Sequence, residues 1–215
     1  MSTSRSRVLI ADDHKLVADL CKRLLESEFE VIDIVCDGRA LVQSAIKLRP
    51  DVIVVDVAMP LLNGLDAGQQ VKATLPAVKI VYLTMNPDPE VAAEAFRRGA
   101  SAYLLKTCAA DEMIIAIRKV LRGMSYMSSR LPKDTIDYLR RQSKKLVEEE
   151  DRLTQRQREV LQLLAEGKVM KEVGSILNMT TRTVAFHKYR IMEVIGARSS
   201  ADLVKYAVKN NMVGA

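Results

Sequence analysis

The sequence contains few of the features that would argue against an ordinary globular fold. Its 215 residues include only nine glycines and six prolines, and 48% of the chain is hydrophobic. These values are typical of a packed chain rather than an unfolded one. No apolar run is longer than a few residues, which excludes a membrane span, and the polar start MSTSRSR lacks the apolar core of a signal peptide. We therefore expect a cytoplasmic protein with no membrane partner.

Cysteine is also scarce. Cys21, Cys36 and Cys108 form no C-x-x-C pair and are odd in number. This pattern suits reduced thiols in a reducing compartment. We expect all three to be buried and inert, because free cysteine is among the most buried residue types.

Net charge is missing from most of the chain and is concentrated at its end. Residues 1–123 hold 16 Lys and Arg against 16 Asp and Glu, and residues 124–151 hold 6 against 6. Residues 152–215 hold 11 against 5, so the whole excess of +6 lies in this last segment. A small basic terminal domain favours a polyanionic partner.

Residues 1–123 alternate short β-branched runs with longer segments whose apolar residues recur at helical spacing. Strand and helix repeated five times predict right-handed crossovers and a doubly wound, five-stranded parallel sheet with helices on both faces. In such an α/β fold the functional residues lie at the carboxyl ends of the strands. The expected strands are residues 8–11, 31–35, 52–55, 79–84 and 102–105.

Residues 124–151 are rich in charge and lack a wide apolar face, so we expect a helical linker there. Leu139, Leu146 and Leu153 are seven residues apart, which leaves a coiled coil open, but the intermediate positions are polar.

Residues 152–215 predict a small all-α domain of four helices. Thr154 and Gln157 have the spacing of a capping box, and Gly167 ends the first helix. Two short helices joined by a tight turn, in a basic context, indicate a helix-turn-helix. Its second helix is expected over residues 181–195.

Several polar residues stand where the expected strands end, so the sheet would bring them together. They are Asp12, Asp13, Asp56, Thr84 and Lys106. Carboxylates packed this closely repel one another unless a cation lies among them, and Mg²⁺ prefers such oxygen ligands. The pocket could hold a phosphoryl group, with Lys106 and the metal neutralising its oxygens, Thr84 donating a hydrogen bond and Asp56 as the nucleophile.

The segments ADDH, DVAMPLLNG, VYLT and GASAYLLK resemble the receiver domains of bacterial two-component response regulators, which have a flavodoxin-like fold. The segments LTQRQREVLQLLAEGK and TRTVAFHKYRIM resemble the LuxR-type helix-turn-helix. Essentially the whole chain thus resembles a response regulator of the NarL/FixJ type. The resemblance implies a DNA-binding transcription regulator rather than an enzyme, with residues 1–123 as receiver, 124–151 as linker and 152–215 as output domain.

The resemblance also implies roles for the pocket residues. Asp56 would accept a phosphoryl group from a sensor histidine kinase. Asp13, Asp56 and the carbonyl of Ala58 would ligate Mg²⁺, and Asp12 would act through water. Thr84 and Tyr103 would form the switch pair, and Lys106 would contact the phosphate.

The predicted recognition helix has two different faces. Taking Val184 as inward at 100° per residue places His187, Ile191 and Ile195 on the same side. We expect the opposite face to contact double-stranded promoter DNA, with Arg182 on a guanine or a phosphate and Phe186 on a thymine methyl. The expected DNA-contacting residues are Arg182, Ala185, Phe186, Lys188, Tyr189 and Arg190.

Some residues of the expected output domain depart from the pattern of the resembled family. Val169 and Met170 stand where an N-capping Ser and Asn are usual, so a cap is missing. Glu193 adds an acid and Val194 replaces a lysine near the end of the recognition helix. We therefore expect a modest affinity for DNA.

Two other functions stay open on the sequence. A haloacid-dehalogenase-like phosphohydrolase also uses a strand-end Asp, but Ala58 stands where its second Asp would be. A regulator that binds a polymerase or kinase through its helices is the other alternative.

For a phosphorylated response regulator we expect a homodimer, with RNA polymerase left open as a further partner. In the unphosphorylated state we expect the receiver to cover part of the recognition helix, or to keep the last helix from pairing with a second copy.

Overall fold

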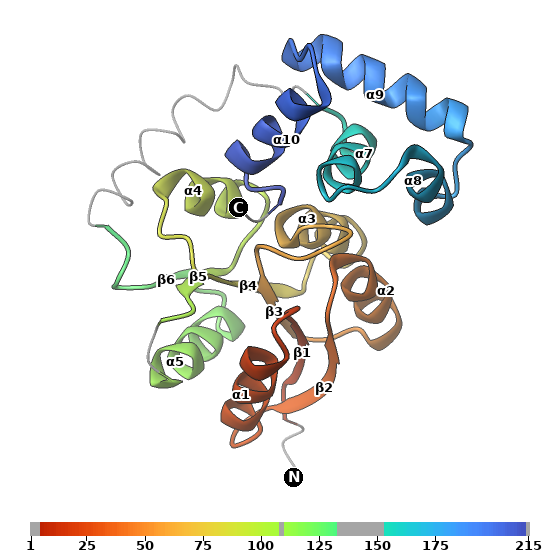
Figure 1. The fold of residues 1–215 in the computed structure, drawn as a ribbon. Helices are drawn as coiled ribbons and strands as arrows, with labels where there is room; N and C mark the ends of the chain where they lie inside the picture. The colour runs from red at the N-terminus through yellow and green to blue at the C-terminus, as the bar shows by residue number, and fades with distance from the viewer. Residues whose placement is uncertain (1–4, 108–109, 133–152, 214–215) are drawn as a thin grey trace.

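The computed structural model describes residues 5–107, 110–132 and 153–213. They form a sheet unit, residues 5–107 and 110–132, and a helical unit, residues 153–213 (Figure 1). The elements of the sheet unit are β1 (Arg7–Ala11), α1 (Lys15–Leu25), β2 (Glu30–Val35), α2 (Gly38–Leu48), β3 (Val52–Asp56), α3 (Gly64–Thr74), β4 (Lys79–Thr84), α4 (Pro89–Arg97), β5 (Ala102–Leu105), α5 (Ala110–Leu121) and β6 (Tyr126–Met127).

The sheet is parallel throughout and has the order β2-β1-β3-β4-β5-β6. The predicted doubly wound α/β fold is confirmed, but the predicted count of five strands is wrong because β6 adds a sixth. Tyr103 of β5 pairs with Met127 of β6. Two residues are too few to show a strand periodicity, which explains why β6 was not predicted.

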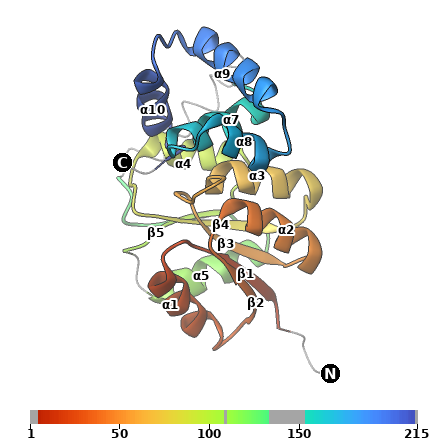
Figure 2. The ribbon, with the colours of Figure 1, turned by 45° about the vertical axis from the view of Figure 1, so that its right-hand side comes forward.

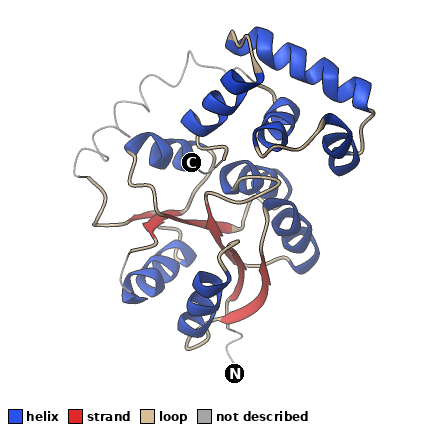
Figure 3. Ribbon diagram, viewed as in Figure 1, coloured by secondary structure: helices blue, strands red, loops and turns tan. Residues whose placement is uncertain are grey.

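Helices cover both faces of the sheet, α1 and α5 on one and α2, α3 and α4 on the other (Figure 3). Successive side chains of a strand point to opposite faces. In β1, Leu9 therefore packs with the α2 side, whereas Val8 and Ile10 pack with the α1 side. β3 is buried along its whole length, as expected for a central strand of a parallel sheet.

The sheet unit extends beyond Gly123, the boundary that the sequence predicts. β6 joins the sheet after this residue, and Leu131 is buried in the core on the α2 side. Residues 133–151, most of the predicted helical linker, lie outside the described residues, as do Leu139 and Leu146 of the alternative coiled coil.

The helical unit contains α7 (Gln155–Ala165), α8 (Met170–Leu177), α9 (Thr181–Ile195) and α10 (Ser200–Lys209) around a core of its own. The predicted capping box of Thr154 and Gln157 is confirmed. α9 has the predicted bounds and ends at Gly196, whose φ of 70° suits a glycine. Val169 is the N-cap residue of α8 and provides no side-chain cap, as the sequence predicts.

The thiols differ in exposure. Cys21 is buried, but Cys36 is exposed, so the expectation that all three cysteines are buried is wrong for Cys36. Cys36 follows the edge strand β2, whose residues are only partly covered. Cys108 lies outside the described residues. Among the described helices, none is long and apolar enough to cross a membrane.

Candidate functional site

Four strands deliver polar side chains to one end of the sheet. Asp12 follows β1, Asp56 ends β3, Thr84 ends β4 and Lys106 follows β5. Because these strands are neighbours in a parallel sheet, their carboxyl ends lie side by side. Asp56, Asp12 and Thr84 are 4%, 4% and 3% exposed, so the group forms a buried polar pocket.

Lys106 bridges the two buried acids. Its Nζ lies 2.8 Å from Asp12 Oδ2 and 2.8 Å from Asp56 Oδ2. Burial alone would lower the pKa of Lys106, but hydrogen bonds and charge from the two carboxylates raise it above its usual value. Burial raises the pKa of Asp56, and Lys106 offsets that effect only in part. The ionised pocket therefore holds one cation for two carboxylates.

The same pocket has the oxygen ligands of a cation site. Asp12, Asp13, His14 and Asp56 each place one possible ligand atom within 4.8 Å of the others. Three carboxylates and partial burial fit a hard divalent cation such as Mg²⁺. Ala58, predicted to offer its carbonyl, donates its N–H to Asp56 Oδ1 at 3.3 Å.

His14 was not predicted as part of this pocket. Its Nδ1 lies 2.8 Å from Asp13 Oδ1, and its side chain is largely exposed. Its position directly after the acid pair was the only signal in the sequence.

The predicted switch pair is connected through a residue that the sequence did not single out. Tyr103 is fully buried, and its hydroxyl donates to the carbonyl of Asn86 at 3.1 Å. The Asn86 N–H in turn donates to Thr84 Oγ1 at 3.0 Å. Burial raises the pKa of Tyr103, with a hydrogen bond from Thr84 acting in the opposite direction. Thr84 and Tyr103 are thus linked through the turn after β4.

The loop after Asp56 is tightly fixed. The N–H of Gly64 donates to the carbonyl of Val57 at 2.9 Å, and a Cβ at Gly64 would lie 2.0 Å from the carbonyl oxygen of Asp56. Only glycine fits this close approach. Leu61 has a φ of 64°, a left-handed conformation that costs an ordinary side chain roughly 1–2 kcal/mol.

The outer face of α9 is open to solvent. Phe186 and Tyr189 are 61% and 70% exposed, whereas Val184 and Ile191 are fully buried and His187 is half-buried. The inward and outward faces are therefore those that the spacing predicts.

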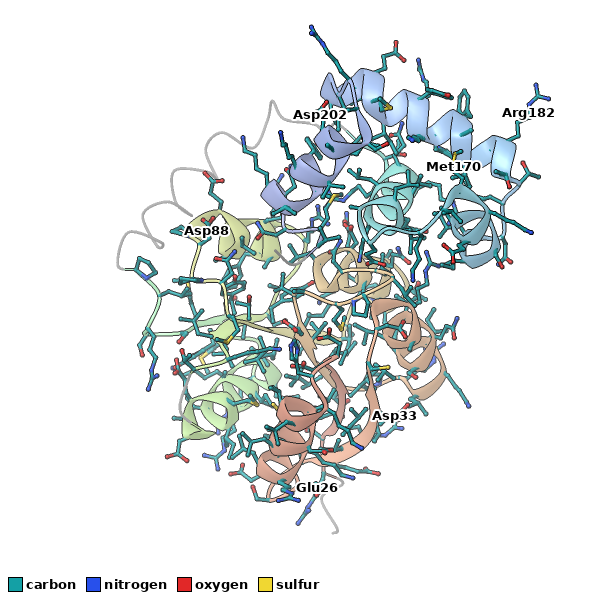
Figure 4. All side chains as sticks on the ribbon, viewed as in Figure 1. Glu26, Asp33, Asp88, Met170, Arg182 and Asp202 are labelled. Atoms are coloured by element: carbon teal, nitrogen blue, oxygen red, sulfur yellow. The ribbon has the colours of Figure 1, made fainter. Side chains whose placement is uncertain are left out.

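Arg182 extends away from the molecule at the start of α9 (Figure 4). Arg190 is also exposed and pairs with Glu193 at 2.7 Å, while the Lys188 ammonium donates to Ser200 Oγ at 3.3 Å. Ala185 lies half-buried between the two faces. Of the two expected forms of inhibition, cover of this reading face by the sheet unit is not met, since these arginines and aromatic rings are exposed. That the last helix is kept from pairing with a second copy stays a prediction.

The sheet unit instead contacts the helical unit through α7, which lies beside α3 in both views (Figures 1 and 2). The fully buried Gln162 binds Met59 and Asn63 of the loop after β3. Around it, Arg158 lies 2.8 Å from Asp66, and Glu159 lies 3.0 Å from Arg39. The one feature of the sequence that corresponds to this interface is a polar stripe at helical spacing along α7.

The Asp66 carboxylate at this interface is held in its charged form. Burial would raise its pKa, but the charges of Arg158 and Arg98, together with hydrogen bonds from Arg158 and Asn63, lower it below the usual value. At the other end of the interface, the Asn86 amide donates to Asn211 Oδ1 at 3.0 Å, so the segment after α10 contacts the turn after β4.

This fold and pocket agree with two protein families. Residues 8–118 match the response regulator receiver domain, and residues 151–207 match the luxR family of bacterial regulatory proteins. The chain belongs to the response regulators that join a receiver domain to a LuxR-type DNA-binding domain. Members of this class regulate transcription and are not enzymes. The alternative of a haloacid-dehalogenase-like phosphohydrolase is therefore rejected.

Relatives share this two-part organisation. The oxygen regulatory protein NreC of Staphylococcus aureus is 31% identical over 96% of this chain and 99% of its own. A structure of the RcsB response regulator of Salmonella typhimurium is 25% identical, covers 98% of this chain and 100% of its own, and has a TM-score of 0.63. A structure of two RcsB dimers bound to two parallel DNAs is 26% identical over 94% of this chain and 98% of its own, with a TM-score of 0.56.

Proposed function

We propose that Asp56 accepts a phosphoryl group from a sensor histidine kinase and that this event controls promoter binding by α9. The observation that carries the proposal is the position of Asp56. It is the one carboxylate of the described pocket that ends a buried central strand, hydrogen-bonded to Lys106 on one oxygen and to the Ala58 N–H on the other.

The proposed transfer is a single displacement at phosphorus. A carboxylate oxygen of Asp56 attacks the phosphorus of a phosphohistidine, a P–O bond forms, and the P–N bond breaks. The kinase imidazole leaves with the bonding electron pair. Lys106 neutralises the phosphoryl oxygens on one side, and the Thr84 hydroxyl can donate to one of them on the other.

A Mg²⁺ ion fits the acid cluster. Asp13 and Asp56 are the proposed direct ligands together with the Ala58 carbonyl, and Asp12 is proposed to act through water. When bound, the ion neutralises the charge on the transferred group. The Asp12 carboxylate, which shares Lys106 with Asp56, keeps that ammonium aimed into the pocket.

The output function proposed for α9 is readout of double-stranded promoter DNA. Its exposed face combines basic and aromatic side chains, which suits the edges of bases and the phosphates of a major groove. The proposed contacts are Arg182, Ala185, Phe186, Lys188, Tyr189 and Arg190. Two copies acting on a two-fold site would give the homodimer that we propose for the phosphorylated state.

Other partners follow from this function. The protein is proposed to act in the cytoplasm, where both DNA and the kinase domain are accessible, and RNA polymerase is a further candidate partner. A regulator that binds only proteins is the alternative. For such a regulator, no salt-dependent binding to promoter DNA is expected.

The test is chemical labelling. Acetyl phosphate and Mg²⁺ should label the full-length protein once, with the label on Asp56. An Asp56→Asn variant should take up no label, whereas Asp19→Asn, which changes an exposed acid of α1, should label normally. Persistent labelling of the Asp56→Asn variant would refute the assignment.

A further inference from the structure

His14 brings an imidazole nitrogen to a pocket whose other possible metal ligands are carboxylate oxygens. It is the N-cap residue of α1, but its side chain makes no capping hydrogen bond to the helix. The ring instead faces the acid pair, with Nδ1 2.8 Å from Asp13 Oδ1 and 3.4 Å from Asp12 Oδ1. The chain has only two histidines, and the other, His187, belongs to α9. An imidazole in this pocket can therefore come only from His14.

The spacing of these atoms is that of ligands around one ion. In an octahedral site with metal–ligand bonds of about 2.1 Å, neighbouring ligand atoms lie about 3 Å apart and opposite ones about 4.2 Å apart. Asp12, Asp13, His14 and Asp56 each place a ligand atom within 4.8 Å of the others. One ion can therefore contact His14 Nδ1 together with carboxylate oxygens of Asp13 and Asp56.

The ammonium of Lys106 does not occupy the side of the pocket where His14 lies. It contacts the Oδ2 atoms of Asp12 and Asp56, whereas His14 approaches Oδ1 of Asp12. The side chains of Asp13 and His14 are 34% and 66% exposed, and that of Lys106 is 7% exposed. The imidazole thus stands on the solvent side of the pocket, where an ion can enter.

An imidazole ligand changes which ion a carboxylate site prefers. Mg²⁺ binds oxygen ligands and keeps several of its waters, so it gains little from a nitrogen. Imidazole nitrogen suits transition ions such as Ni²⁺ and Zn²⁺. A ligand set of carboxylates with one imidazole should therefore hold such ions more tightly, relative to Mg²⁺, than the carboxylates alone.

We propose that His14 is a ligand of the cation site and that its nitrogen makes the pocket select a divalent transition ion over Mg²⁺. This inference rests on the cation site of the proposed function and leaves the role of Asp56 unchanged. Mg²⁺ still fits the carboxylates, so the two kinds of ion compete for one position. Phosphoryl transfer to Asp56 then depends on which ion the pocket holds.

The experiment compares three full-length proteins without a polyhistidine tag, because a tag would bind the same ions. They are the wild type, His14→Gln and His187→Gln. Glutamine keeps a polar side chain and offers no imidazole. His187→Gln is the matched control, since it removes the other histidine of the chain, on α9. Circular dichroism checks that each variant is folded.

Two measurements report on the ligand independently of phosphorylation. Electron spin-echo modulation of bound Mn²⁺ detects a nitrogen nucleus that is coordinated directly to the ion. Titration calorimetry with Ni²⁺ alone and with Mg²⁺ alone gives the ratio of the two affinities.

We expect nitrogen modulation in the wild type and in His187→Gln, and none in His14→Gln. The preference for Ni²⁺ over Mg²⁺ should fall at least about tenfold in His14→Gln, because loss of even an outer-shell partner of a metal ligand costs about 10- to 100-fold in affinity. His187→Gln should keep the preference of the wild type.

No nitrogen modulation in the wild type, or modulation that persists in His14→Gln, would overturn the inference. An unchanged preference for Ni²⁺ in His14→Gln would overturn it as well. In these cases the wild type still binds Mg²⁺ and is labelled by acetyl phosphate, so the proposed function stands. If the wild type neither binds Mg²⁺ nor takes up label in its presence, the proposed function itself fails.

Discussion

Asp56 is the residue at which stability and function conflict. It lies in a buried pocket with Asp12, and the single ammonium of Lys106 is shared between the two carboxylates. Burial raises the pKa of Asp56 in spite of that partner, so the folded protein disfavours the charged form that a nucleophile needs. A cation bound by the acid cluster would relieve this cost, which links metal binding to stability.

The raised pKa predicts a pH-dependent gain in stability for Asp56→Asn. A carboxyl group with a raised folded-state pKa contributes stability below its unfolded value of 3.8, and this contribution is lost as pH rises through the folded-state pKa. The neutral Asn variant keeps the contribution at pH 7. Its melting temperature in the presence of a chelator should therefore exceed that of the wild type, by about 2–4 °C per kcal/mol gained.

The gain should shrink as pH falls towards 4, because wild-type Asp56 then becomes neutral as well. Calorimetry at several pH values measures this difference. A variant that melts below the wild type at pH 7 would show that the pairing with Lys106 outweighs burial.

We predict that Lys106 is needed more for the response to phosphorylation than for the phosphoryl transfer itself. In Lys106→Ala, Asp56 remains available as the nucleophile, so acetyl phosphate should still label the protein. The labelled variant should show at least a fivefold smaller gain in DNA affinity than the labelled wild type, since nothing replaces the ammonium contact with the phosphoryl group. Gel shifts of labelled and unlabelled protein measure this gain, and Lys47→Ala, on the exposed face of α2, is the control. An undiminished gain would exclude the proposed role.

At the level of elements, the sequence predicts most of the fold and the pocket but not the docking of α7. β3 was predictable because four β-branched residues precede Asp56, and the ends of four strands then place the pocket residues together. Gln162 was not predictable as a contact residue, because a polar helical face looks the same whether it meets water or another domain. β6 was missed because its two residues carry no period.

The exposed face of α9 leads to paired predictions. Arg182→Ala should weaken promoter binding by about 1–3 kcal/mol, or roughly 5- to 150-fold, if the guanidinium reads a base. Glu193→Gln should strengthen binding, because it removes an acid from the DNA-facing side and releases Arg190 from an ion pair of 2.7 Å. Fluorescence anisotropy with promoter and scrambled duplexes measures both effects. Equal losses on the two duplexes would assign Arg182 to a phosphate contact instead.

At the level of the whole molecule, charge and function are divided between the two units. The +6 excess lies in residues 152–215, whereas residues 1–123 are balanced. The sheet unit can therefore dock on α7 without strong long-range attraction or repulsion, and its local ion pairs, such as that of Arg158 with Asp66, determine the fit.

This charge distribution predicts a steep dependence of DNA binding on salt. The logarithm of affinity should fall linearly with the logarithm of salt concentration, with a slope near −0.9 for each phosphate contact. Lys188→Ala should make the slope shallower by about 0.9, the value for one phosphate contact. Arg23→Ala, on the exposed side of α1, should leave the slope unchanged. A flat profile for the wild type would support the regulator that binds only proteins.

The sixth strand determines where a receiver fragment of this chain can be cut. β6 covers the edge of β5, with the Ser128 N–H donating to the Tyr103 carbonyl at 2.9 Å, and Leu131 fills the core nearby. A receiver fragment cut after Gly123 would expose the backbone of β5 along one side. Open edges of this kind recruit strands from other chains, so the shorter fragment should aggregate. A fragment that ends at residue 132 keeps the edge closed and should remain monodisperse.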